Sequence, residues 1–279
     1  MRVAVTGASG YVGGVILRAF QAQGHEGLAW SRRPCPGSWT PFDLKADPRT
    51  LPWDQVDALV HTAYDFAPRD WNDIVASNVK PSIALLRAAS DAGVRRLVFI
   101  SSISSFEGTR SNYGGAKLMI EEAALSLGAA VVRPGLVWGD QPGGVMGALQ
   151  MLVEKLPLIP YLQGRGGLAQ FLAHEDDLSR AVVTLAQNLP AGGGSVHEAT
   201  HPNPVPLLQI LKEIARRSNR SRCYLPIPWQ VALCGLKTLE ALGINPLFRS
   251  DSLIGLVHRV PSLRATGSPH AVDYRPFRS

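Results

Sequence analysis

Cysteine is scarce in this chain of 279 residues, and the few cysteines present do not form a metal-binding pattern. Cys35, Cys223 and Cys234 are odd in number and lack the spacing of a metal site. This usage predicts a reduced, cytoplasmic setting without a bound metal. The sequence also lacks a basic-then-apolar leader at its start and any apolar run of about eighteen residues, so we expect neither a secretory signal nor a membrane-spanning helix.

Acidic residues are scarce in the last quarter of the chain. Residues 212–279 contain 11 Lys/Arg and 4 Asp/Glu, whereas residues 1–211 contain 17 and 18. The basic excess is consistent with a pocket for an anionic substrate, with attraction to an anionic membrane, or with a solvated surface. Because no nucleic-acid-binding motif accompanies the charge, we expect no nucleic-acid partner.

A glycine-rich turn lies at the start of the chain, between an apolar run and a helical pattern. Val3–Val5 is typical of a buried strand, and apolar residues from Val15 onward recur at helical spacing. Gly7 permits a tight turn, Gly10 lets a pyrophosphate approach the backbone, and Gly13 lets the helix lie close to the sheet. Free N–H groups in the first helical turn would bind the phosphates, so we predict a dinucleotide site. The other residues expected at this turn are Ser9, Tyr11 and Val12.

The expected second strand, 26–30, ends at two arginines with no acidic residue beside them. An acidic residue here would hydrogen-bond to the ribose 2′-hydroxyl of NAD(H), whereas arginine accommodates the 2′-phosphate of NADP(H). Ser31, Arg32 and Arg33 therefore favour NADP(H), with NAD(H) as the alternative. If both arginines contact only water, they do not indicate whether NADP(H) or NAD(H) binds.

Tyr113 and Lys117 are four residues apart, which on a helix places both side chains on one face. A nearby ammonium favours the phenolate and lowers the pKa of a tyrosine, so Tyr113 could exchange a proton with an alcohol or carbonyl oxygen. A serine at the end of the preceding strand would hydrogen-bond to the same oxygen. Ser101, Ser102 and Ser104 are the candidate serines at this place.

Short apolar runs alternate with helical patterns through most of the chain. Such runs occur at residues 58–63, 94–100 and 130–134. Nearly continuous apolar runs suit strands buried on both faces, so we predict an α/β fold, a doubly wound parallel sheet of the Rossmann type with a small mixed C-terminal lobe. The expected division is a dinucleotide-binding domain over 1–195, with 140–172 contributing to the substrate side, and a substrate-side lobe over 196–279.

These motifs resemble a known enzyme superfamily. The turn Thr6–Gly13, with the pattern Thr-Gly-x-x-Gly-x-x-Gly, and the pair Tyr113 and Lys117 resemble the short-chain dehydrogenase/reductase superfamily. Two further segments, Arg133–Gly139 and Phe171–Leu178, are similar to those of its extended branch, the NAD(P)-dependent epimerase/dehydratase family. The likeness is good up to about residue 200 and poor beyond it.

The resemblance implies roles for residues along the cofactor cleft. Asp43 and Leu44 would lie near the adenine ring, and Asn78 would support the active site through backbone groups. Lys117 would also hold the nicotinamide ribose. Ser102, the second serine of the Ser-Ser pair, matches the family pattern for the catalytic serine best, with Ser101 and Ser104 as alternatives. The further cofactor-binding residues expected are Thr62, Ala63, Tyr64, Pro134 and Val137. His174 and Asp177 would be mainly structural, and His61 is expected to be a packed strand residue.

The predicted activity is hydride transfer at a carbinol or carbonyl carbon by an NAD(P)-dependent oxidoreductase or epimerase, with Tyr113 as general acid/base. The substrate would be a nucleotide sugar or another anionic small molecule, and a homodimer is an open expectation. Eleven positions separate Ser102 from Tyr113, fewer than in many sugar-nucleotide epimerases, so the sequence specifies no particular sugar. The alternative is that the chain is a structural or regulatory protein that binds NADP(H) without catalysing a reaction. One form of this alternative is a protein peripheral to a membrane.

Further helices are expected on either side of the sheet strands. A helix over 71–92 should kink at Pro81. In the C-terminal part, helices are expected over 206–217 and 227–242, the second as a core helix, with a partner or membrane surface as the alternative. Candidate ligands for a substrate phosphate are Arg249 and Arg259.

Overall fold

The computed structural model contains a seven-stranded sheet with the strand order β10-β6-β5-β4-β1-β2-β3, in which every neighbouring pair is parallel. It describes residues 1–164, 168–190, 193–244, 246–258, 263 and 272–277. The strands are β1 (Arg2–Thr6), β2 (Glu26–Ser31), β3 (Trp39–Pro41), β4 (Ala58–His61), β5 (Arg96–Ile100), β6 (Ala130–Pro134) and β10 (Ser195–Ala199). The five inner strands β6, β5, β4, β1 and β2 are almost wholly buried, as expected for a sheet covered on both faces, whereas the edge strands β3 and β10 are mostly half-buried.

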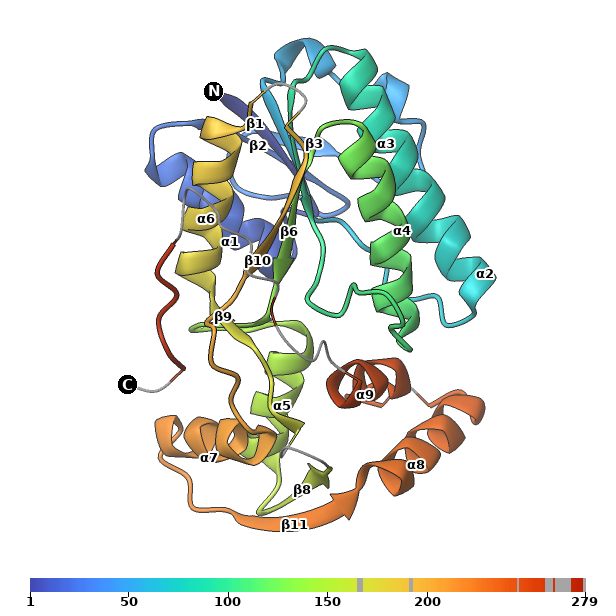
Figure 1. Ribbon diagram of the computed structural model, residues 1–279, viewed down its shortest axis with the longest axis vertical. Helices are drawn as coiled ribbons and strands as arrows, with labels where there is room; N and C mark the ends of the chain where they lie inside the picture. The colour runs from blue at the N-terminus through green and yellow to red at the C-terminus, as the bar shows by residue number, and fades with distance from the viewer. Residues whose placement is uncertain (165–167, 191–192, 245, 259–262, 264–271, 278–279) are drawn as a thin grey trace.

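Helices cover both faces of this sheet (Figure 1). The helices on one face are α1 (Tyr11–Ala22) and α6 (Glu175–Asn188), and those on the other are α3 (Lys80–Asp91) and α4 (Asn112–Ser126). Two apolar cores result, one on each face. The predicted doubly wound α/β fold is therefore confirmed. Single-turn 3₁₀ helices lie at Pro48–Thr50 and Trp53–Gln55.

The helix expected over 71–92 is interrupted in a different place from the one predicted. The chain forms α2 (Trp71–Ile74), a π-helical segment (Val75–Val79) and then α3. The backbone keeps right-handed helical angles at Val75, Val79 and Lys80, so Pro81 lies within a continuous helical stretch, close behind the π-helical segment. The irregular turn is the π-helical segment upstream, which carries Asn78.

The C-terminal part packs around a third apolar core beyond the carboxyl edge of the sheet. Its elements are β7 (Leu136–Trp138), α5 (Gly144–Lys155), β8 (Leu158–Gln163), β9 (Leu172–His174), α7 (Leu207–Arg217), β11 (Cys223–Pro228), α8 (Trp229–Ala241) and α9 (Ser250–Val257). The boundary predicted at residue 195 does not match the sheet, because β10 pairs with β6 over Ser195–Ala199. The division into two domains therefore stays a proposal, with the sheet extending to Ala199.

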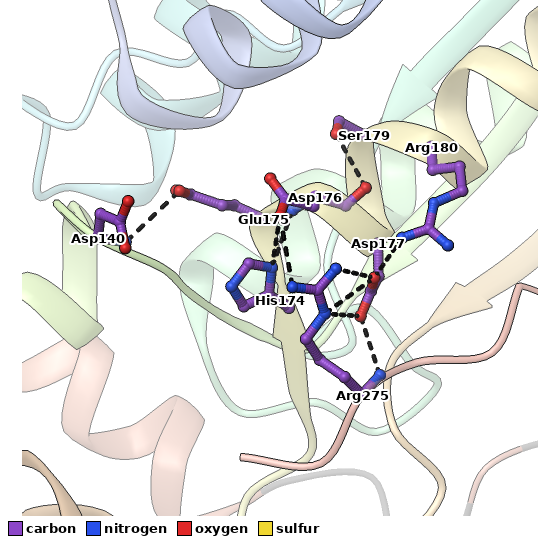
Figure 2. Close-up of polar contacts among 8 residues, drawn as sticks. All are labelled: Asp140, His174, Glu175, Asp176, Asp177, Ser179, Arg180 and Arg275. Atoms are coloured by element: carbon purple, nitrogen blue, oxygen red, sulfur yellow. Dashed lines mark hydrogen bonds and ion pairs between the residues drawn. The ribbon is translucent and has the colours of Figure 1, made fainter. Parts of the chain in front are cut away.

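Residues near the C-terminus are attached to α6 by a buried carboxylate, as Figure 2 shows. Asp177 accepts a 2.7 Å hydrogen bond from Arg180 and bonds from the backbone N–H and the guanidinium of Arg275. His174 caps α6 by accepting a hydrogen bond from the backbone N–H of Asp176. Both His174 and Asp177 thus have structural contacts, as predicted.

The prediction that α8 is a core helix is wrong. None of the thirteen residues in α8 is buried. Val231 is 61% exposed, and Leu242, which follows the last turn, is 71% exposed. No helix within the described ranges has the length and apolar character needed to cross a bilayer.

Candidate active site

A cleft of about 1170 Å³ lies at the carboxyl edge of the sheet. It begins where the strand order reverses, with β2 on one side of β1 and β4 on the other. Ligands of open α/β sheets bind at such a switch point. The predicted residues that line it are Gly7, Ser9, Gly10, Tyr11, Val12, Ser31, Arg32, Arg33, Asp43, Leu44, Thr62, Ala63, Tyr64, Ser102, Tyr113, Lys117, Pro134 and Val137.

The glycine turn has the shape that a dinucleotide pyrophosphate requires. Gly7 has a φ of +69°, and its carbonyl accepts a 2.8 Å hydrogen bond from the Gly10 N–H. A Cβ added to Gly13 would lie 2.4 Å from the Gly7 carbonyl oxygen, so the helix could not approach this closely with any other residue. Gly10 begins α1 without a side-chain cap, which leaves the helix N-terminus open to an anion. These residues fit the pyrophosphate of a dinucleotide.

The end of β2 brings two exposed arginines to the same cleft. The Ser31 hydroxyl donates a 2.6 Å hydrogen bond to the Arg33 carbonyl, and this contact fixes the turn after the strand. The Arg33 guanidinium lies 3.3 Å from the carbonyl oxygen of Ser9, so it reaches the glycine turn. Arg32 lines the cleft beside it and is exposed. Both arginines thus line the part of the cleft that adjoins the glycine turn.

Buried polar groups hold the end of β4 in place. His61 is fully buried between the hydroxyls of Thr6 and Ser82, at 2.7 and 2.9 Å. Burial lowers the pKa of His61 to about 3, so this residue is a neutral packed side chain and not a catalytic base. The Thr6 hydroxyl also accepts hydrogen bonds from the backbone N–H groups of Thr62 and Ala63.

Asn78 does not line the cleft but fixes the segment beside it. Its side-chain carbonyl accepts a 2.6 Å hydrogen bond from the Asp65 N–H, and its amide donates a 3.0 Å bond to the Asp65 carbonyl. The side chain is fully buried in the π-helical segment. Asn78 therefore supports backbone groups next to Tyr64, as the resemblance implied, without itself being available to a ligand.

Tyr113, Lys117 and Ser102 meet in the middle of the cleft. The Ser102 side chain lies near enough to Tyr113 to lower its pKa in part, whereas the Ser101 hydroxyl donates to the carboxylate of Glu121. The Lys117 ammonium is buried and donates a 2.8 Å hydrogen bond to the Ile100 carbonyl. It lies 5.8 Å from the centre of the Tyr113 ring. Of the serines considered, Ser102 is thus the one placed against the phenol.

Burial controls the charge of this pair more strongly than mutual attraction does. Removal from water raises the pKa of Tyr113 to about 12, although Ser102 lowers it in part. Burial also lowers the pKa of Lys117 to about 7, while the nearby Glu121 raises it in part. The expected lowering of the tyrosine pKa by the lysine is therefore not what the free protein shows. At neutral pH Tyr113 is a phenol, which is a proton donor.

The lysine pKa leads to a prediction about stability. Unfolded Lys117 holds its proton up to about pH 10.5, whereas the folded chain releases it near pH 7. Between these values the unfolded state binds more protons, so raising the pH stabilises the fold by at most about 1.4 kcal/mol per pH unit. Lys117→Met lacks this term. We expect wild-type stability to rise relative to Lys117→Met from about pH 7 to about pH 9.5, measured by urea unfolding.

The matched control for this experiment is Lys80→Met, because Lys80 is an exposed lysine on α3. Its stability difference from the wild type should stay constant over the same pH range. If the difference between wild type and Lys117→Met also stays constant, Lys117 is not the titrating group.

Contacts that no sequence pattern indicated tie the C-terminal lobe to the active site. Asp251 of α9 accepts hydrogen bonds from the backbone N–H groups of Asn112 and Tyr113, at 2.7 and 3.1 Å, and from the Ser111 hydroxyl. It therefore caps the helix that carries Tyr113. About 140 residues separate Asp251 from this helix, and no local pattern points to such a contact.

The candidate phosphate ligand Arg249 lines the cleft but is already engaged. Its guanidinium donates to the carbonyls of Phe66 and Pro68, which holds the loop after β4. The Phe66 ring packs against Tyr64 and Tyr113, with centroids 4.9 and 5.8 Å away. An aromatic wall thus flanks the phenol. The other candidate, Arg259, lies outside the described residues.

Comparisons with known proteins agree with this geometry. The model of the NAD dependent epimerase/dehydratase family matches residues 3–196. The curated 2′-dehydrokanamycin reductase of Streptomyces kanamyceticus is 28% identical over 298 residues, covering 98% of this chain and 82% of that protein. The UDP-glucose 4-epimerase of Azospirillum brasilense is 26% identical over 247 residues, covering 70% and 71%. The structure of UDP-glucose 4-epimerase from Thermus thermophilus, in complex with NAD, aligns with a TM-score of 0.69 at 20% identity, covering 92% and 97%.

The fold and the site define an extended short-chain dehydrogenase/reductase. This chain belongs to the NAD-dependent epimerase/dehydratase family, and it is an NAD(P)-dependent enzyme. Both expectations from the sequence are confirmed. The family match ends at residue 196, close to where the likeness seen in the sequence fades.

Proposed function

We propose that this enzyme reduces a carbonyl group on a sugar-like or other anionic small molecule, with NADPH as the preferred cofactor. The observation that carries the proposal is Tyr113 in a cleft that starts at the dinucleotide turn, with Ser102 and Lys117 beside it and with a pKa that burial raises to about 12. A reductase needs a proton donor at the carbonyl oxygen, and a phenol with a raised pKa is one.

In the proposed reduction, Tyr113, Ser102 and Lys117 each have a separate role. When bound, the nicotinamide supplies the hydride, which goes to the carbonyl carbon. The Tyr113 hydroxyl gives its proton to the carbonyl oxygen, so that an alcohol forms, and the phenolate regains a proton from solvent. Ser102 holds the same oxygen by a hydrogen bond. Lys117, fixed on the Ile100 carbonyl, stabilises the phenolate while it exists.

Similarity to curated proteins supports reduction without excluding epimerisation. The relative aligned over nearly the whole chain is named 2′-dehydrokanamycin reductase. Epimerisation of a nucleotide sugar is the second candidate, favoured by the relative named UDP-glucose 4-epimerase. Oxidation and re-reduction at one carbon could use the same Tyr113, Lys117 and Ser102.

The experiment that separates these activities follows both cofactor and product. The protein is incubated with NADPH and a panel of keto-sugars, and separately with NAD and UDP-glucose. Reduction predicts consumption of NADPH together with formation of the sugar alcohol. Epimerisation predicts UDP-galactose without a net change in NAD. If neither occurs although NADPH or NAD binds, the non-catalytic alternative replaces both.

The cofactor preference gives a prediction about the arginines after β2. Arg32→Ala with Arg33→Ala should weaken NADPH binding by about 10–100-fold, because a charge-assisted hydrogen bond is worth about 1.5–3 kcal/mol. NADH lacks the 2′-phosphate, so its affinity should change by less than about 3-fold. Dissociation constants are measured by titrating the fluorescence of each reduced cofactor.

Arg95→Ala is the matched control, because Arg95 is an exposed arginine that precedes β5. It should leave both affinities unchanged. Equal losses for NADPH and NADH in the double variant would mean that Arg32 and Arg33 do not bind a 2′-phosphate.

A further inference from the structure

A large aromatic ring is exposed inside the cleft, next to the phenol of Tyr113. Phe66 lines the cleft and is 62% exposed. Its ring is nearly parallel to the Tyr113 ring, with an interplanar angle of 24°, and it also packs against Tyr64. Tyr64 and Tyr113 thus cover only part of Phe66. Leaving the rest of this ring in water costs free energy that a ligand would recover by covering it.

The backbone that carries Phe66 is held from two sides. The Asn78 side chain bonds to both the N–H and the carbonyl of Asp65, at 2.6 and 3.0 Å. The Arg249 guanidinium donates to the carbonyls of Phe66 and Pro68. Because the ring is carried on a fixed segment, little conformational freedom is lost when a ligand covers it.

The charged groups nearest to Phe66 are engaged within the protein. Asp65 pairs with Lys45, with 3.6 Å between the charged atoms. Asp251 accepts hydrogen bonds from the first turn of α4, and Arg249 is used by the backbone carbonyls named above. The cleft beside Phe66 therefore offers an aromatic surface and no free ionic partner among these groups.

Two other cations line the cleft, Arg110 and Lys237, and neither pairs with a described residue. Both side chains are exposed, and water weakens the attraction of an exposed cation for an anion. A charged substituent would thus find its partners in the wetter parts of the cleft.

Uncharged hydrogen-bonding groups, in contrast, remain available. The hydroxyls of Ser104 and Ser252 and the side-chain amide of Asn112 line the cleft, and none of them bonds to a described residue. Ser252 comes from α9, which lies against α4, the helix that begins with Asn112 (Figure 1). These groups can each donate and accept hydrogen bonds, as a hydroxylated ligand requires.

An exposed aromatic face beside free neutral polar groups fits one kind of ligand. The face of an aromatic ring is electron-rich and attracts C–H groups, while hydroxyls at the edge of a saturated ring can bond to serine and asparagine. We propose that Phe66 determines substrate specificity by binding the C–H face of an uncharged, hydroxylated ring that carries the reacting carbonyl. This inference rests on the proposed function, which places the reacting oxygen at Tyr113.

The test measures binding without turnover. The full chain, saturated with NADP or NAD, is titrated with methyl β-glucopyranoside, an uncharged hydroxylated ring, and with sorbitol, which has hydroxyls but no ring. Saturation transfer in NMR from aromatic protein protons to the probe reports the contact, and its concentration dependence gives the Kd. Phe66→Ala should weaken pyranoside binding by about 5–10-fold and leave sorbitol binding unchanged. Phe66→Trp, which keeps an aromatic face, should retain pyranoside binding.

Trp71→Ala is the matched control, because Trp71 is 38% exposed on α2 and does not line the cleft. This variant should bind the pyranoside like the wild type. Unchanged melting temperature and NADPH affinity would show that each variant is folded. With the keto-sugar identified from the panel, Phe66→Ala should raise KM by a similar factor and change kcat by less than about 3-fold.

Two outcomes would overturn the role of Phe66. The first is a wild-type protein that transfers no saturation from its aromatic protons to the pyranoside ring. The second is a Phe66→Ala variant that binds the pyranoside, or reduces the panel sugar, as well as the wild type. Pyranoside binding that depends on Phe66, without reduction of any sugar in the panel, would instead overturn the proposed reduction and leave the ring-binding role in place.

Discussion

Tyr113→Phe should lower the turnover number by about 10²–10⁴-fold and leave the affinity for NADPH unchanged. Phenylalanine keeps the ring that packs against Phe66 and Tyr64 but lacks the proton that the substrate oxygen requires. The hydroxyl that is removed makes no hydrogen bond with the glycine turn, so the pyrophosphate site should stay intact. Turnover is measured with the substrate identified from the panel, and affinity by cofactor fluorescence.

The matched control is Tyr224→Phe, because Tyr224 lies on β11 in the C-terminal lobe and does not line the cleft. Its turnover and cofactor affinity should equal those of the wild type. A Tyr113→Phe variant with full turnover would refute the role of Tyr113 as the proton donor. Equal losses of turnover and cofactor affinity would indicate a distorted cleft instead.

The second large effect concerns stability beneath the active site. Glu121→Ala should lower the free energy of unfolding by about 3–5 kcal/mol, because it leaves a buried guanidinium without its partner. The Glu121 carboxylate accepts hydrogen bonds from Arg133 at 2.9 and 2.5 Å, and also from the Ser101 hydroxyl. The side chains of Glu121 and Arg133 are only 2% and 9% exposed. Urea unfolding measures the loss.

Two further variants make this prediction specific. Glu122→Ala removes the exposed neighbour on the same helix and should change stability by less than about 0.5 kcal/mol. Glu121→Leu combined with Arg133→Met removes both charges and should recover much of the stability lost in Glu121→Ala. A loss below about 1 kcal/mol in Glu121→Ala would mean that water reaches Arg133 and that the pair is not truly buried.

The ion pair also bears on the chemistry above it. Glu121 lies one helical turn beyond Lys117 and raises the pKa of that lysine against the effect of burial. Ser101, which bonds to Glu121, directly precedes Ser102 in the chain. Lys117 and Ser102 are therefore both linked to the ion pair of Glu121 and Arg133. Glu121→Ala should reduce turnover as well as stability.

The local parts of the site could be predicted from the sequence, because they depend on short spacing. Gly7, Gly10 and Gly13 define a turn that only residues without a Cβ can form at this closeness. Tyr113 and Lys117 share a helix face because they are four residues apart. The buried strands follow from their continuous apolar runs. Each of these features is settled within about a dozen neighbouring residues.

The tertiary structure alone decided the features that join distant segments. Asp251 reaches the Tyr113 helix from about 140 residues away, and β10 completes a sheet that the boundary predicted at residue 195 would have ended too early. An apolar helical pattern shows that α8 has an apolar face but not whether protein covers it, and that depends on how the lobe packs. Likewise, spacing places Lys117 beside Tyr113, but burial decides their pKa values, because desolvation depends on everything packed around them.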